Sequence, residues 1–256
     1  MTEFDAALSS VAALDEAALG RSWSFRGQTM DVRYALYRTI EDAQEAHVRL
    51  VGRPLPESRR ILSFAQRAFG DLRGLLVGLP SDLIDRVPGA GEWPVREVLR
   101  HMWVVERRYA IQTLYALERA DSDPVRIADD RLPTAAQMDA TGGIDEELAR
   151  LGEVRAESNR RLGDVAPALM TRPTIWARYE VDVRFRLHRF AAHVLEHTIQ
   201  CEKALAALGW QPTEGRRIAR QLAALVGEIE GLGANAEARE IEHLLAERLV
   251  SATAAS

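Results

Sequence analysis

The residues best suited to chemistry in this sequence are two histidines four positions apart. His193 and His197 lie in the segment LHRFAAHVLEHTIQ, residues 187–200. On a helix this spacing places both imidazoles on one face, one turn apart, where both can bind one metal ion. The alternative is a buried or partly solvated pair with local hydrogen bonds. His188 would point about 140° away from His193 and is a poor candidate for the same ion.

A further histidine lies in a different apolar segment. His101 belongs to GEWPVREVLRHMWVVERRY, residues 91–109. A buried imidazole needs a polar partner, so His101 either hydrogen-bonds across a helical bundle or supplies a third nitrogen to the histidine pair. Two helices of a bundle can present such ligands to one ion. Three neutral nitrogens suit zinc, nickel, iron or copper and leave positions open for water or substrate.

The same segment contains a glutamate and is followed by the single cysteine. HVLEH fits the H-x-x-E-H pattern, in which the glutamate is the general base of a metalloprotease. Such proteases need a mixed fold with a sheet, which this sequence does not predict. Glu196 remains a candidate base or a group that supports bound ligands, and the alternative is a solvated or ion-paired side chain. Cys201 is interpreted as a buried, inert side chain rather than a fourth ligand.

Three arginines lie at helical spacings from the histidines. Arg108 is seven residues after His101, and Arg186 and Arg189 are seven and four residues before His193. A guanidinium group binds a carboxylate with two hydrogen bonds, so these arginines are candidates to hold a carboxylate of a co-substrate. The alternative is solvated surface arginine, because 32 of the 33 basic residues are arginine. The tryptophans at 93, 103 and 176 are interpreted as packing residues.

The composition excludes several classes of protein. The chain has 256 residues and a net charge of −5, which argues against a general nucleic-acid-binding protein. One cysteine excludes an intrachain disulfide and any site built from several cysteines. No stretch approaches the roughly 18–20 apolar residues of a membrane span, and the acidic start MTEFDAALSS does not resemble a signal peptide. We therefore expect a cytoplasmic protein with no nucleic-acid or membrane partner.

The elements that must position these residues are predicted to be helices. The chain has 39 alanines and 30 leucines against 18 valines, 11 isoleucines and 11 threonines. Apolar residues recur at intervals of three and four, and no alternating run is bounded by turn signals. The sequence therefore predicts an all-α fold without strands. The expected helices cover residues 3–19, 29–51, 57–79, 94–119, 144–164, 182–208, 213–231 and 235–250.

One internal similarity is visible near two helix starts. DVRYALYR, residues 31–38, resembles DVRFRLHR, residues 182–189. Asp31 and Asp182 are suited to cap or precede the first turn of a helix. We interpret the similarity as a shared way to begin a helix. The alternative is that the arginines at 33, 96 and 184 lie at equivalent levels of a bundle.

The wider pattern resembles a known family. LLVGLPSDLIDRVPGAGEWPVREVLRHMWVVERRY, residues 75–109, followed by H-x-x-x-H on a long helix with Gln200 after it, is similar to the DinB-like superfamily. The resemblance covers about residues 58–211 and implies a four-helix bundle. Residues 1–57 and 212–256 are then additional N-terminal and C-terminal helical extensions.

The resemblance also implies a metal site and an activity. A divalent metal would be held by His101, His193 and His197, with zinc expected before nickel, iron or manganese. Characterised relatives use mycothiol, bacillithiol or glutathione, as S-transferases, as an isomerase of maleylpyruvate or as partner domains of sulfoxide synthases. We therefore expect a small-molecule substrate and a thiol S-transferase or hydrolase activity. The alternative is a non-catalytic metal-binding or interaction bundle. A homodimer is expected unless the extensions cover the usual dimer surface.

Overall fold

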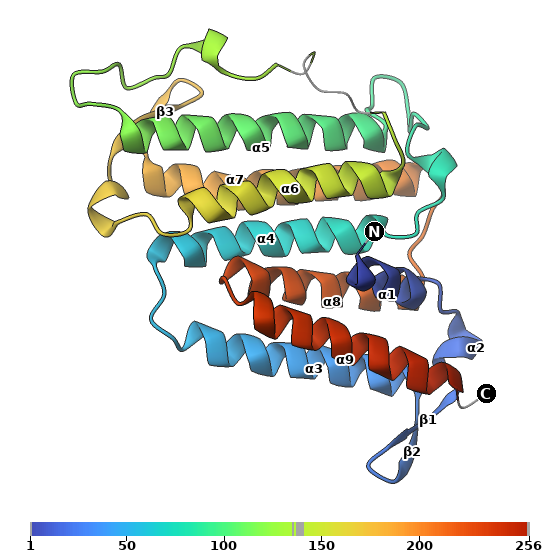
Figure 1. Cartoon of the computed structure of the whole chain (residues 1–256). Helices are drawn as coiled ribbons and strands as arrows, with labels where there is room; N and C mark the ends of the chain where they lie inside the picture. Colours follow the sequence, from blue (N-terminus) through green and yellow to red (C-terminus); the bar gives the residue numbers. More distant parts are fainter. Residues whose placement is uncertain (1, 135, 137–140, 255–256) are drawn as a thin grey trace.

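The middle of the chain folds into a four-helix bundle (Figure 1). The computed structural model describes residues 2–134, 136 and 141–254. The helices of this central bundle are α4 (Glu57–Leu76), α5 (Val95–Glu118), α6 (Ile144–Leu162) and α7 (Val183–Ala207). Both α4 and α5 pack against α6 and α7, so the four helices close around a shared interior. The prediction of an all-α four-helix bundle is confirmed.

Local sequence signals explain where the bundle helices begin and end. Pro94 precedes α5, and its fixed φ of −65° suits a helix start. The Asp182 carboxylate caps α7 by accepting a hydrogen bond from the backbone N–H of Phe185 at 2.8 Å. Beyond α4, Gly78 takes a positive φ of 61°, a conformation that favours glycine, and Pro80 prevents further helix. These signals set the registers of α5 and α7, the two helices that carry the histidines of interest.

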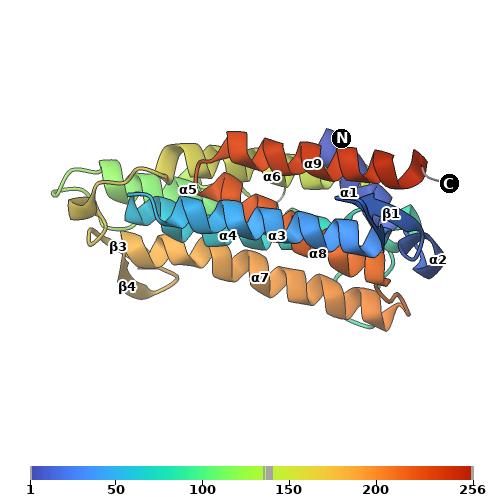
Figure 2. The same ribbon diagram turned by 90° about the horizontal axis from the view of Figure 1, so that it is seen from below.

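The terminal segments add helices on one side of the central bundle (Figures 1 and 2). They are α1 (Glu3–Ala12), α2 (Glu16–Leu19), α3 (Val32–Val51), α8 (Glu214–Gly231) and α9 (Asn235–Ala254). Helix α8 lies along α4, and α1, α3 and α9 pack around α8. Their buried apolar side chains form a core of their own, to which the central segment contributes Val77.

The single helix predicted over residues 3–19 is wrong. The Asp15 carboxylate accepts a hydrogen bond from the backbone N–H of Ala18 at 2.8 Å and begins the separate short helix α2. The other predicted helices are present with ends that differ by a few residues.

Two β-hairpins occupy positions where no strands were predicted. β1 (Ser22–Phe25) pairs with β2 (Gln28–Asp31), and β3 (Pro173–Trp176) pairs with β4 (Tyr179–Asp182), both antiparallel. Each two-residue turn begins with a residue of positive φ, Arg26 at 50° and Ala177 at 54°. Four-residue strands are too short to show an alternating pattern, and Ala177 is not a usual turn residue. The hairpins lead into α3 and α7 and lie at opposite ends of the molecule in both views (Figures 1 and 2).

Short 3-10 turns lie in the connections. They are η1 (Ser81–Leu83), η2 (Asp129–Arg131) and η4 (Pro167–Leu169). Among the described residues, no helix is both long enough and apolar enough to cross a membrane.

Candidate metal centre

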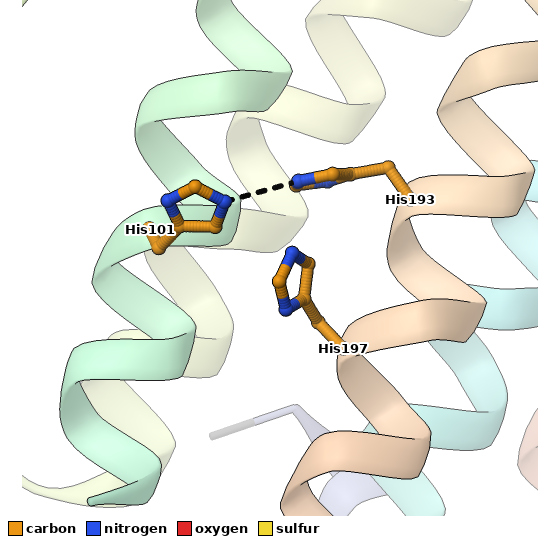
Figure 3. Close-up of side chains that lie close together, drawn as sticks. All are labelled: His101, His193 and His197. Carbon is orange, nitrogen blue, oxygen red and sulfur yellow. Dashed lines mark hydrogen bonds between the residues drawn. The ribbon is translucent and has the colours of Figure 1, made fainter. Parts of the chain in front are cut away.

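Three histidine side chains from two helices of the central bundle point toward one another (Figure 3). His101 comes from α5, and His193 and His197 come from successive turns of α7. The ligand atoms all lie within 4.8 Å of one another, and the Nε2 atoms of His101 and His193 are 3.3 Å apart. His193 and His197 are buried, and His101 is half-buried. Within the described parts of the chain, this is the one group of histidine, cysteine or acidic side chains compact enough to hold a metal ion.

Neighbouring side chains orient the imidazoles. The Nδ1 atom of His197 donates a hydrogen bond to Oε1 of Gln200 at 2.7 Å, which leaves Nε2 of His197 available to a metal. The Tyr109 ring contacts the His193 ring edge-to-face, with ring centroids 5.5 Å apart. Tyr109 is itself held against Phe190, with centroids 5.7 Å apart. The cluster is therefore held in place from both helices.

The surroundings keep two of these imidazoles neutral. Burial, together with the adjacent His197 and His101, lowers the pKa of His193 to about 3. Burial, followed by the neighbouring His197, also lowers the pKa of His101. Neutral imidazole is the form that binds a metal ion. Three converging nitrogen donors, with no thiolate among them, fit a divalent transition metal.

The cluster forms one wall of an open pocket with a volume of about 400 Å³. Helix α5 contributes Arg108 and Gln112 to the lining, and α7 contributes Arg189 and Glu196. The β3–β4 hairpin closes one side with Trp176. Two arginines beside a site for a cation make the pocket suited to a small anionic molecule.

Besides the histidines, three of the predicted site residues lie in this pocket. The Arg189 guanidinium stacks over Trp176 at 4.7 Å from the ring centroid and lies 3.9 Å from the exposed Glu196 carboxylate. The Nε atom of Arg189 is buried and has no hydrogen-bond partner among the residues that the structure describes. Arg108 donates a hydrogen bond to the carbonyl oxygen of Pro133 at 2.9 Å. The pocket therefore brings Arg108, Arg189 and Glu196 close to the histidines.

Comparison with protein families identifies a family for the segment that contains these histidines. A model of the DinB superfamily matches residues 65–201, which is more than half of the chain and includes all three histidines. The chain belongs to the DinB superfamily. A solved structure similar to this DinB-superfamily protein is YfiT from Bacillus subtilis, described as a probable metal-dependent hydrolase with an unusual four-helix bundle topology. The two chains share 16% identity over 60% of this chain and 89% of YfiT, with a TM-score of 0.49. No curated protein matches the chain.

Two other predicted residues of the DinB-superfamily protein are not among those that line the pocket. Arg186 is buried and donates hydrogen bonds to the Ile175 carbonyl oxygen, at 2.7 Å, and to Oε1 of Gln112. Burial lowers its pKa to about 10. It ties the β3–β4 hairpin to α5. Cys201 is fully buried in the bundle core, and burial raises the pKa of its thiol to about 12, in keeping with its interpretation as inert.

Tyr109 and Gln112 were not predicted as site residues from the sequence. Both follow His101 on the same face of α5, at eight and eleven residues, so helical periodicity alone would have identified them. Trp176 was interpreted as a packing residue and lines the pocket of the DinB-superfamily protein instead. The unpredicted hairpin is the reason, since it carries Trp176 over the end of the bundle.

Proposed function

We propose that this DinB-superfamily protein is a metal-dependent enzyme that acts on a small anionic molecule, with a low-molecular-weight thiol as co-substrate. The observation that carries the proposal is the convergence of His101, His193 and His197 on the wall of an open pocket. Three protein ligands leave positions free for a substrate, as in catalytic rather than structural sites. A bound divalent metal, with zinc expected first, would lower the pKa of a coordinated thiol or water.

Two arginines are assigned to hold the co-substrate. Arg108 of α5 and Arg189 of α7 both line the pocket, and a guanidinium group binds a carboxylate with two hydrogen bonds. The buried Nε of Arg189 has no hydrogen-bond partner in the described part of the chain, and a bound carboxylate would accept a hydrogen bond from it. Arg189 is therefore the main carboxylate contact, with Arg108 second. Arg186 is left out of this role because its guanidinium holds the hairpin.

Glu196 is assigned to move a proton. Its carboxylate lines the pocket and is exposed, and Arg189 lies 3.9 Å away. In thiol transfer, Glu196 accepts the proton released by the thiol, the sulfur bonds to an electrophilic carbon, and the leaving group departs with its electron pair. Hydrolysis is a second candidate reaction, because the same carboxylate can accept a proton from water.

Metal content tests the first part of this proposal. Protein purified without a metal-affinity tag is expected to contain about one divalent metal per chain, and the His101→Ala variant is expected to lose it. His188→Ala is a matched control, because His188 is exposed on α7 and lies outside the cluster. Full metal occupancy in the His101→Ala variant would show that the ligand set is wrong.

Turnover tests the second part. Metal-loaded protein is incubated with a panel of low-molecular-weight thiols and a model electrophile, and separately with activated esters and amides. We expect thiol consumption that is lost in His101→Ala and kept in His188→Ala. Ester or amide cleavage without thiol consumption would favour hydrolysis. Absence of activity of the metal-loaded protein in both panels would contradict an enzymatic function and indicate a non-catalytic metal-binding bundle.

A further inference from the structure

Helix α8 repeats the sequence of α4. ESRRILSFAQRAFGDLRGLL, residues 57–76, aligns without a gap with EGRRIARQLAALVGEIEGLG, residues 214–233. Seven positions are identical: Glu57/Glu214, Arg59/Arg216, Arg60/Arg217, Ile61/Ile218, Gly70/Gly227, Gly74/Gly231 and Leu75/Leu232. The matched positions include both glycines of a G-x-x-x-G pair, so the similarity extends beyond shared helical periodicity.

The hairpin-and-helix units on α3 and α7 also repeat one plan. Residues 22–51 and 173–202 each contain a four-residue strand, a two-residue turn that begins with a positive φ, a second four-residue strand and a long helix. In each unit the last strand residue caps the helix: Asp31 accepts a hydrogen bond from the N–H of Tyr34 at 2.7 Å, as Asp182 does from Phe185. The DVRYALYR and DVRFRLHR similarity therefore belongs to a whole structural unit rather than to a helix start alone.

The repeated elements are assembled in the same way. Helices α8 and α9 each pack against α1 and α3, as α4 and α5 each pack against α6 and α7. The ion pairs at the helix starts also correspond. Arg33 of α3 pairs with Glu214 at the start of α8 at 2.7 Å. In the same way, Arg184 of α7 pairs with Glu57 at the start of α4 at 2.5 Å. Helices α1, α3, α8 and α9, which we call the second bundle, are thus counterparts of α6, α7, α4 and α5.

The two bundles meet through the same surface of each. A Cβ atom added to Gly70 would lie 2.2 Å from the Ala223 carbonyl oxygen, so α4 and α8 approach closely at this point. The counterpart of Gly70 is Gly227, and a Cβ there would lie 2.7 Å from the carbonyl oxygen of Gln66, the counterpart of Ala223. The close approach of α4 to α8 at Gly70 is thus matched by its reverse at Gly227. This reciprocity is typical of a two-fold interface between identical subunits.

The second bundle lacks the histidines. The alignment of α3 with α7 places Asp42 at the position of His193 and Ala46 at the position of His197. The Asp42 carboxylate is 2.7 Å from the guanidinium of Arg248 on α9. The pairing of α3 and α9 at this point therefore relies on an ion pair where the central bundle has its histidine cluster.

The counterpart of His101 is found from the pattern of buried residues along α9. The buried residues of α9 follow the spacing of those on α5: Ala238, Ile241 and Leu245 correspond to Leu99, Met102 and Glu106. This register places Glu240 at the position of His101 and Arg248 at that of Tyr109. Asp42 and Glu240 both line an open pocket of about 370 Å³, as the histidines do in the central bundle.

A buried ion pair also distinguishes the two interiors. In the central bundle, Arg155 of α6 donates a hydrogen bond to Glu106 of α5, and both side chains are buried. Continued without a gap to α1 and α6, the alignment of α3 with α7 places Phe4 at the position of Arg155. Phe4 and Leu245, the counterpart of Glu106, are both buried in an apolar core. Apolar pairs can replace buried ion pairs without loss of stability. The second bundle thus has apolar side chains where the first has this buried ion pair.

We propose that the chain contains two copies of one four-helix bundle, and that the second bundle has lost its metal ligands and occupies the place of a second subunit. The surface of α4 that would otherwise bind another molecule is bound by α8 of the same chain. The protein therefore works as a monomer with one metal centre, in contrast to the homodimer that the family resemblance implies.

The mass in solution tests the role as a built-in subunit. Sedimentation equilibrium of the full chain, over a hundredfold range of concentration, is expected to give the monomer mass of 28.5 kDa throughout. A stable species of twice that mass would overturn the proposal, because it would show that another surface still recruits a second subunit. This result does not depend on whether the histidines bind metal.

Transfer of the ligands tests the correspondence between the bundles. Asp42→His, Ala46→His, Glu240→His and Arg248→Tyr are combined in a chain whose three native histidine ligands are replaced by alanine. The same triple-alanine chain without the transferred residues is the control. We expect the transferred set to restore cobalt binding, from none to about one ion per chain, measured by visible absorption and elemental analysis. A variant with native circular dichroism and no cobalt would overturn the residue correspondence, provided that the unmodified chain binds cobalt. If the unmodified chain does not bind cobalt, the proposed function fails and the mass measurement decides the role of the second bundle.

Discussion

Replacing Gln200 by alanine should weaken metal binding without removing a ligand. Gln200 Oε1 accepts the Nδ1 hydrogen bond of His197 at 2.7 Å, and this contact fixes both the ring orientation and the nitrogen that carries the proton. Without the amide, the His197 ring can rotate and can carry its proton on Nε2, the atom required by the metal. In the Gln200→Ala variant, metal binding must therefore also reorient the ring and move the proton to Nδ1, which lowers the affinity.

The size of the effect follows from the exposure of Gln200. Loss of a hydrogen-bond partner to a metal-binding histidine weakens affinity by about 10–100-fold. Gln200 is half-buried, so water can take the place of the missing amide oxygen. We expect the lower end of the range, a Kd about tenfold weaker, which corresponds to about 1.4 kcal/mol. Gln200→Glu keeps an acceptor in place and is expected to retain wild-type affinity or exceed it.

Competition titration against a chelator of known affinity measures these changes. The wild type, Gln200→Ala, Gln200→Glu and the His188→Ala control are loaded with zinc or cobalt at one pH, and each Kd is fitted. Circular dichroism confirms that each variant is folded. If Gln200→Ala binds within twofold of the wild type, or if Gln200→Glu is as weak as Gln200→Ala, then the Gln200 contact does not position His197.

Three further predictions concern the interface, the cysteine and the pocket. Gly70→Ala should lower the free energy of unfolding by about 1–3 kcal/mol in urea titration, since its Cβ would lie 2.2 Å from a backbone oxygen. The control Gly52→Ala, with no contact nearer than 3.7 Å, should leave the stability nearly unchanged, and equal stabilities of the two variants would contradict close packing of α4 and α8. Cys201, with a pKa raised to about 12 by burial, should not react with a thiol reagent at pH 8 until urea unfolds the chain; rapid reaction of the native protein would contradict its burial. Arg189→Met should raise KM about tenfold or more for thiols that carry a carboxylate and leave KM for neutral thiols unchanged, because a hydrogen bond to a charged group is worth about 1.5–3 kcal/mol. An equal rise in KM for both kinds of thiol would show that Arg189 does not bind the carboxylate.

The helices could be predicted because their signals are local. Proline at 80 and 94 and aspartate at 182 mark helix ends, and apolar spacing of three and four residues marks the faces between them. The hairpins could not be predicted in this way, since each strand has only four residues and their pairing is held partly by tertiary contacts. Arg186 is one such contact: it ties the Ile175 carbonyl to α5 across the hairpin. No local sequence pattern predicts that contact.

The candidate site also contains residues that local spacing predicts and residues that it does not. The spacing of His193 and His197 on one helix was sufficient to predict a shared face. His101 is 92 residues away from His193, and its spacing alone left two interpretations open; the family resemblance was needed to choose between them. The arginines show the limit of periodicity as well. Arg186 and Arg189 are both spaced to lie near His193, yet burial beneath the hairpin takes Arg186 out of the pocket lining.

The order of the helices has a consequence for synthesis on the ribosome. The first helices, α1 and α3, complete their packing against α8 and α9, and the Arg33–Glu214 pair spans 181 residues of chain. At about 5–20 residues per second, the ribosome needs roughly 10–40 s to make that stretch. The central bundle is complete before α8 emerges and can fold first. During that interval the apolar faces of α1 and α3 have no native cover, so this is the stage at which the nascent chain is most exposed to aggregation and most dependent on chaperones.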